Sequence, residues 1–192
     1  MPPPEPWLRG THTDLPAVLR AVVHALELAR EDIDAACAPL ADADLHARPA
    51  QIAPVAFHLR HIARSLDRLL TYAEGGELSA AQLDALRSEL DAPGPKSGSG
   101  SASQSGSGSA TKAGLLAEFH LGLDAALRRI RVFAGDTNGA AADLEQPRAV
   151  GRRALPTTVG GLLVHCADHT QRHTGQAVTT AKLAAASHSG TP

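Results

Sequence analysis

Three histidines spaced four residues apart, His165, His169 and His173, lie in the segment TTVGGLLVHCADHTQRHTGQAV. Imidazoles at positions i and i+4 project from one face of a helix, so two of them can bind a single metal ion. The segment PVAFHLRHIARSLDRLL carries His58 and His61 and can supply a third nitrogen from a facing helix. Three neutral imidazoles with one coordination position left open are typical of catalytic zinc-type sites. The sequence therefore predicts that the protein acts where these two segments meet.

Helical periodicity separates the three histidines of the later segment. Each residue advances by about 100° around a helix, which places His169 and His173 on the apolar stripe that should face the core. His165 falls on the flank of the helix, together with Arg172 and Gln176. We therefore expect His169 and His173 to bind the metal ion. His165 would support a ligand from behind or contact substrate at the rim.

The earlier segment leaves a choice between two histidines. Its apolar stripe consists of Val55, Ile62, Leu66, Leu69 and Ala73. His61 lies at the edge of this stripe, and His58 lies slightly nearer to it. Periodicity alone favours His58 by a small margin and does not decide between the two.

The alternative is that these histidines have a structural role and bind no metal ion. A helical histidine is more often a half-buried structural residue than a ligand. A structural role is also the interpretation adopted for the isolated histidines, namely His12, His24, His46, His120 and His188. Cys166 is expected to be a small core residue and Asp168 an exposed one. The second cysteine, Cys37, gives no disulfide framework with Cys166.

Composition limits the classes of protein that the chain can represent. Its 192 residues fit a single domain, 1–192, and only 3% of them are aromatic, so the core must be mainly aliphatic. The net charge of −2 and the absence of a long basic cluster argue against nucleic-acid binding. There is no secretory leader pattern and no apolar run of about 18 residues. We expect a cytoplasmic protein that binds no membrane.

Apolar residues spaced by three and four predict four long helices, with a shorter one between the second and the third. The long helices are expected at 14–37, 54–74, 113–134 and 157–185, and the short one at 79–90. Thr13 or Asp14 would cap the first helix, and Ser79 with Gln82 forms a capping-box pattern for the short one. Such a chain is predicted to be all-α, a four-helix bundle whose long connections exclude the simplest up-and-down order.

Three segments are expected to be irregular. Residues 92–112 are rich in Gly and Ser, as in natural insertions and engineered linkers alike, and should form a flexible linker within the domain. Residues 138–156 should be an irregular or partly extended connection. Residues 187–192 should be a frayed tail.

Two motifs together resemble the DinB-like superfamily of metal-binding four-helix bundles. The motifs are HLRHIARSLDRLLTYAEG and HCADHTQRHTGQ, the second of which contains the pattern His-x3-His-x-Gly-Gln. The resemblance covers most of the chain apart from the linker and the ends. It implies that the metal ligands are His61, His169 and His173, and so favours His61 over His58. The additional histidines, His58 and His165, depart from the pattern and would be supporting residues or alternative ligands.

The resemblance also implies a function. Relatives include transferases and isomerases in which a divalent metal ion, often zinc or nickel, activates a small thiol such as bacillithiol or mycothiol. The leading hypothesis is thus a metal-dependent transferase acting on small molecules, with Arg172 and Gln176 contacting a carboxylate-bearing cosubstrate. A hydrolase with the same ligands and a non-catalytic, metal-stabilised binding or stress protein are the alternatives. The resemblance is also compatible with a homodimer.

Overall fold

The computed structural model describes residues 3–90, 110–135 and 141–188. Four long helices dominate this part of the chain: α1 (Ala17–Cys37), α3 (Val55–Ala73), α5 (Lys112–Val132) and α6 (Val159–His188). The shorter elements are the helices α2 (Asp42–His46) and α4 (Ala80–Leu90), the 3-10 turns Pro6–Leu8 and Pro49–Gln51, and the strands β1 (Pro147–Val150) and β2 (Leu155–Thr158).

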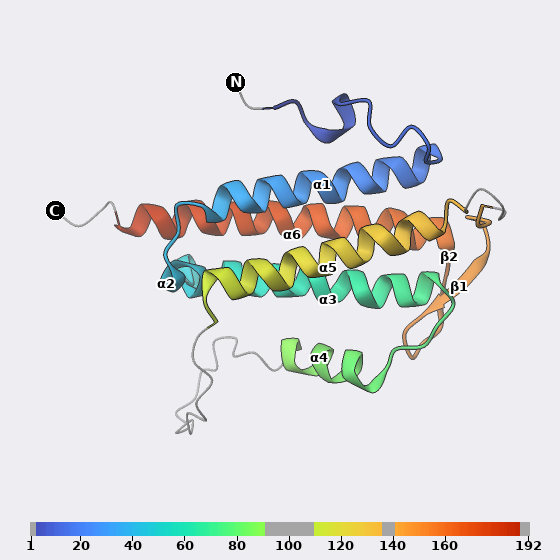
Figure 1. The fold of residues 1–192 in the computed structure, drawn as a ribbon. Helices are drawn as coiled ribbons and strands as arrows, with labels where there is room; N and C mark the ends of the chain where they lie inside the picture. Colours follow the sequence, from blue (N-terminus) through green and yellow to red (C-terminus); the bar gives the residue numbers. More distant parts are fainter. Residues whose placement is uncertain (1–2, 91–109, 136–140, 189–192) are drawn as a thin grey trace.

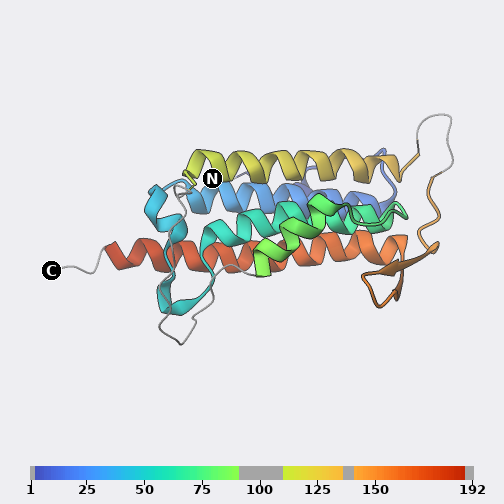
Figure 2. The same ribbon diagram turned by 90° about the horizontal axis from the view of Figure 1, so that it is seen from below.

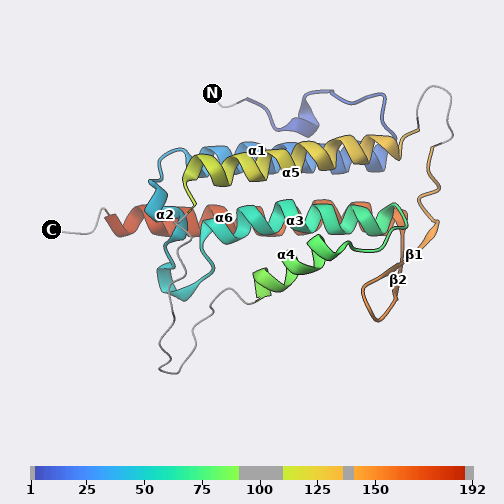
Figure 3. The ribbon, with the colours of Figure 1, turned by 60° about the horizontal axis from the view of Figure 1, so that its bottom comes forward.

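The long helices pack side by side around one aliphatic core (Figures 1 and 3). Helices α1 and α3 each contact both α5 and α6. The large side chains that are fully buried in the core are nearly all Leu or Ile, and Phe119 is the aromatic among them. This confirms the predicted all-α bundle. No helix in the described ranges is both long and apolar enough to cross a membrane.

The order of the helices explains why the chain needs a long connection in its middle. The colour gradient of Figure 1 shows that α1 and α6 run in one direction and that α3 and α5 run in the other. Because the neighbours α3 and α5 are parallel, the chain must return along the bundle between them. Helix α4 makes part of this return and packs on the outside of α3 (Figure 2). Most of the predicted linker at 92–112 lies outside the described residues, which resume at 110.

Side-chain hydrogen bonds cap the first turns of α4 and α5. Helix α4 begins with the predicted capping box, in which Gln82 N donates to Ser79 Oγ at 3.2 Å and Ser79 N donates to Gln82 Oε1 at 2.9 Å. The hydroxyl of Thr111 caps α5 by accepting from Gly114 N at 3.2 Å. The prediction for α1 was wrong, because its N-cap is Pro16 rather than Thr13 or Asp14. Proline suits this position since it has no N–H to leave unsatisfied.

The connection before α6 contains a short antiparallel hairpin that periodicity did not reveal. Strands β1 and β2 pair in it, Pro147 opposite Thr158 and Val150 opposite Leu155. Arg148 Nε donates to Ala73 O at 2.8 Å, which ties the hairpin to the end of α3. At its other end, α6 continues through His188, so the first two residues of the expected frayed tail are helical, and 189–192 lie outside the described residues.

One glycine permits the close packing of α3 against α5. A Cβ atom on Gly122 would lie 2.6 Å from Ala63 Cβ and 3.0 Å from Ala63 Cα.

We expect Gly122→Ala to lower the free energy of unfolding by about 1–3 kcal/mol, because the helices must move apart. Gly175→Ala is the matched control, since a Cβ atom there meets nothing within 4 Å. It should raise the stability by about 0.5–1 kcal/mol through helix propensity. Urea unfolding measures both, and a neutral Gly122→Ala would contradict the packing described.

Candidate metal centre

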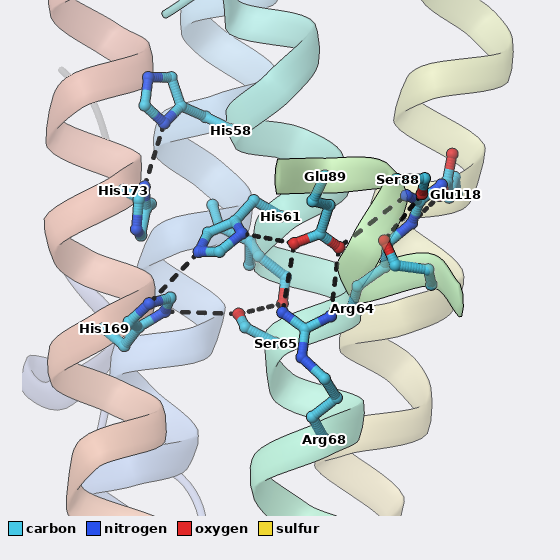
Figure 4. Close-up of polar contacts among 12 residues, drawn as sticks. His58, His61, Arg64, Ser65, Arg68, Ser88, Glu89, Glu118, His169 and His173 are labelled. Atoms are coloured by element: carbon cyan, nitrogen blue, oxygen red, sulfur yellow. Dashed lines mark hydrogen bonds and ion pairs between the residues drawn. The ribbon is translucent and has the colours of Figure 1, made fainter. Parts of the chain in front are cut away.

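The three histidines that the resemblance selected lie together at the contact between α3 and α6 (Figure 4). His61 comes from α3, and His169 and His173 come from successive turns of α6. One ligand atom from each of the three side chains lies within 4.8 Å of those of the other two. We call these residues the three-histidine group.

The ring of His61 is held by a carboxylate behind it. His61 Nδ1 lies 2.9 Å from Glu89 Oε2, and a carboxylate can only accept, so Nδ1 carries the hydrogen and Nε2 keeps its lone pair. His61 Nε2 lies 3.4 Å from His169 Nε2. Two nitrogens that bind one tetrahedral zinc ion are separated by about 3.3 Å, given Zn–N bonds of about 2.0–2.1 Å. The spacing of these two nitrogens therefore fits a shared metal ion.

The ring of His169 is oriented by a hydroxyl group of α3. Ser65 Oγ donates to Ile62 O at 3.1 Å and lies 3.3 Å from His169 Nδ1. Because the hydroxyl hydrogen is used at Ile62, Ser65 Oγ accepts from His169 Nδ1–H. His169 Nε2 then keeps its lone pair and faces His61, as a metal ligand would.

His58 stands behind His173 rather than beside it. The Nδ1 atoms of these two histidines are 3.1 Å apart, so one of them carries the shared hydrogen. When that hydrogen is on His173, its Nε2 has a free lone pair, as in the other two rings. His58 is only 4% exposed and lies outside the three-histidine group. It therefore contacts a candidate ligand from outside the group.

Burial keeps three of these imidazoles neutral at neutral pH. Loss of hydration lowers the pKa of His58, His169 and His173 to about 4 each, and the neighbouring imidazoles add to this effect. The guanidinium of Arg172 also lowers the pKa of His169 and His173. Neutral imidazole is the form that binds metal ions, so these side chains need lose no proton before a metal ion binds.

Glu89 belongs to the site although sequence reasoning missed it. It projects from the last turn of α4 between His61 and Arg68, whose guanidinium nitrogens lie 3.2 Å from its two oxygens (Figure 4). Burial opposes ionisation of this carboxyl group, but hydrogen bonds from His61 and Arg68 outweigh it and lower its pKa. The capping box at Ser79 was the feature of the sequence that pointed to α4. It predicts where this helix starts but not which helix it packs against, so it could not place Glu89 beside His61.

A pocket of about 530 Å³ opens beside the three-histidine group. His58, His173, Arg172 and Gln176 are among the residues that line it, as a site for a small molecule would require. Arg172 forms a 2.6 Å ion pair with Asp168, and both side chains are 55% exposed. The structure thus places Arg172 and Gln176 next to the candidate ligands.

His165 and the cysteines take no part in the three-histidine group. The side chain of His165 is 46% exposed and lies 3.8 Å from Asp168. Its ring centre is 5.5 Å from that of His169, at the edge of the site. Burial raises the pKa of the Cys166 thiol to about 12 and that of the Cys37 thiol to about 11. Neither thiol is ionised near neutral pH, so both are core residues, as expected for Cys166.

We expect Glu89→Gln to weaken zinc binding at this site by about tenfold or more, because a negative charge no longer polarises the His61 ring. Glu118→Gln is the matched control. Glu118 also pairs with arginines of α3, Arg60 and Arg64, but has no histidine partner. Its replacement should change the zinc affinity by less than about twofold. Competition with a chromogenic chelator measures both affinities, and equal effects of the two replacements would exclude this role for Glu89.

Comparison with known proteins agrees with the geometry. The model of the DinB superfamily matches residues 25–177, which include α3, the three-histidine group and most of α6. No curated protein and no solved structure gives a match. The helical bundle and the histidine cluster fit a metal-binding protein. With the match covering most of its length, the chain belongs to the DinB superfamily.

Proposed function

We propose that this protein is a metal-dependent transferase that binds a divalent ion, zinc or nickel, through His61, His169 and His173 and transfers a small thiol to an electrophile. The observation that carries the proposal is the convergence of three imidazoles, each with its Nδ1 engaged by a different neighbour, next to a pocket large enough for a small molecule. This arrangement supports a binding site with room for a further ligand.

The chemistry follows from the donor set. A divalent ion bound by neutral nitrogens keeps its full charge and, as a Lewis acid, would strongly lower the pKa of a thiol that binds to it. The three-histidine group itself contains no carboxylate. Glu89 contributes its charge only through the His61 ring, at 2.9 Å from Nδ1. The protein thus orients the ligands without placing an anion where an acidified thiol would bind.

Arg172 and Gln176 would hold the rest of the thiol cosubstrate. The ion pair of Arg172 with Asp168 is solvent-exposed and spans one helical turn, so it contributes little to stability. Arg172 can therefore exchange Asp168 for a carboxylate of the cosubstrate at little cost. Gln176 follows one turn later on the same wall of the pocket and offers both a donor and an acceptor.

The position of His58 favours catalysis over the non-catalytic alternative. A structural metal site would use a fourth protein ligand. Of the two additional histidines, His58 has its Nδ1 engaged with Nδ1 of His173, and the exposed His165 lies outside the three-histidine group. A hydrolase would use the same three ligands with water as the nucleophile, and the thiol experiment below distinguishes it from a transferase.

Metal analysis tests the ligand set. In protein purified without an affinity tag, we expect the three-histidine group to hold about one divalent ion per chain, because its three nitrogens can bind the same ion. Any ion bound elsewhere would add to this count. The variants His61→Ala, His169→Ala and His173→Ala should each lose the ion of this group. His165→Ala is the matched control, since it removes an exposed histidine of the same helix. Retention of the ion in all three variants would refute the assignment.

Cobalt substitution tests the thiol. Bacillithiol or mycothiol added to the cobalt-loaded protein should produce an intense near-ultraviolet absorption band, which a sulfur ligand gives and water does not. Arg172→Ala should weaken the affinity for the thiol by about tenfold, the loss of one charge-assisted hydrogen bond, and leave the final spectrum unchanged. Absence of the band with every thiol, while cobalt is bound, would favour the hydrolase or the non-catalytic protein.

A further inference from the structure

A second group of side chains able to bind a metal ion lies where the segment before α1 meets that helix. His24 and Glu27 occupy neighbouring turns of α1, and His12 comes from the chain segment before it. One ligand atom from each of the three lies within 4.8 Å of those of the other two. His12 and His24 are isolated in the sequence, and nothing in their spacing indicates that the segment before α1 folds back over this helix.

The ring of His12 contacts both of the other side chains of this group. His12 has a φ of 58°, in the left-handed region that is uncommon for residues other than glycine. His12 Nε2 lies 2.7 Å from Glu27 Oε1. The ring centre of His12 lies 5.5 Å from that of His24, which is 8% exposed and 3.2 Å from Thr11 Oγ1.

From this geometry we propose that His12, His24 and Glu27 bind a divalent transition-metal ion, with zinc as the first candidate. Two imidazoles and one carboxylate are a known donor set for zinc and for other first-row ions. The ion would replace the direct hydrogen bond between His12 and Glu27 and fasten the segment before α1 onto that helix. The DinB superfamily match begins at residue 25, so His12 and His24 lie outside it.

Arg131 would compete with the ion for His12. Its NH2 group lies 2.7 Å from His12 Nδ1 and, as guanidinium can only donate, Nδ1 is the acceptor. The hydrogen of His12 therefore sits on Nε2, the atom that faces Glu27. A metal ion at Nε2 forces this hydrogen to Nδ1, where Arg131 can no longer donate. The Asp14 carboxylate, 3.6 Å from Arg131, offers the guanidinium another partner.

The site is also accessible to small ligands. His24 and Thr11 line a pocket of about 620 Å³ between the N-terminal segment and the helices α1 and α6, with Trp7, Arg20 and Gln171 among its other walls. Three protein ligands leave coordination positions free, so a bound ion could take a further ligand from this pocket.

Zinc titration of a variant that lacks the three-histidine group tests the proposal independently of the proposed function. In His61→Ala/His169→Ala/His173→Ala we expect one zinc ion per chain to remain bound. Adding His24→Ala or Glu27→Gln should abolish this binding. His120→Ala is the matched control, because His120 pairs with Asp34 at 2.8 Å without a third ligand. No zinc bound to the triple variant, when its helical circular dichroism is native, would overturn the proposal.

Two further measurements use the otherwise unaltered chain. Glu27→Gln alone should lower the zinc stoichiometry by one, and an unchanged stoichiometry would overturn the site even if the triple variant fails to fold. Arg131→Ala should tighten zinc binding at this site by roughly three- to tenfold, because it removes a competing cation.

Zinc should also slow tryptic cleavage after Arg9 in the unaltered chain, because the ion would fasten the segment that contains Arg9 onto α1. It should not do so in His12→Gln. Cleavage at the same rate with and without zinc would contradict fastening of the segment.

Discussion

The face along which α3 packs against α6 places His61 opposite His169 and His173, and the other properties of the candidate metal centre depend on this contact. Packing removes water from the imidazoles, and this desolvation is the main reason why the pKa of His169 and His173 falls to about 4. The same contact brings Ser65 to His169 and His58 to His173. This helix pair thus sets the positions of all three donors and orients the rings of His169 and His173.

The partner of His61 Nδ1, Glu89, comes from outside this helix pair and is brought there by the topology of the bundle. Because α3 and α5 are parallel neighbours, the chain must travel back along the bundle, and α4 lies on that path against α3 (Figure 3). The return brings Glu89 to the outer side of His61, where Arg68 compensates its charge. A simple up-and-down bundle would have a short turn here and no residue in this position. The crossover is therefore part of the site as well as a connection.

Sequence periodicity predicted the elements better than the site. The four long helices and α4 were placed within a few residues, because each has a regular apolar stripe. The connection at 138–156 was expected to be irregular or partly extended, and strands β1 and β2 agree with this, but their pairing was not predicted because each has only four residues. Periodicity correctly placed His58 deeper than His61, since His58 is buried and His61 is half-buried. Depth, however, made His58 a neighbour of His173 rather than a member of the group, and only the resemblance selected His61.

Contacts between residues distant in sequence were beyond periodicity altogether. Glu89 lies 28 positions from His61, and His12 lies 15 positions from Glu27. In both cases a carboxylate meets an imidazole because a connecting segment folds back over a long helix. The direction of such a segment is set by tertiary packing, and an amphipathic pattern carries no information about it. The sequence could therefore predict that α4 is a helix, but not that it packs against α3.

The charges around the three-histidine group explain which ligand the site would favour. The charged side chains near it are already paired: Glu89 with Arg68, Glu118 with Arg60 and Arg64, and Asp168 with Arg172. The three-histidine group contains no carboxylate, so a divalent ion would leave the centre with a net positive charge that these pairs do not cancel. Anionic ligands would reduce this charge, and neutral ones would not. Since the Arg172 pair is exposed while the Glu89 pair is buried, an anion entering from the pocket would displace Asp168 and leave Glu89 in place behind His61.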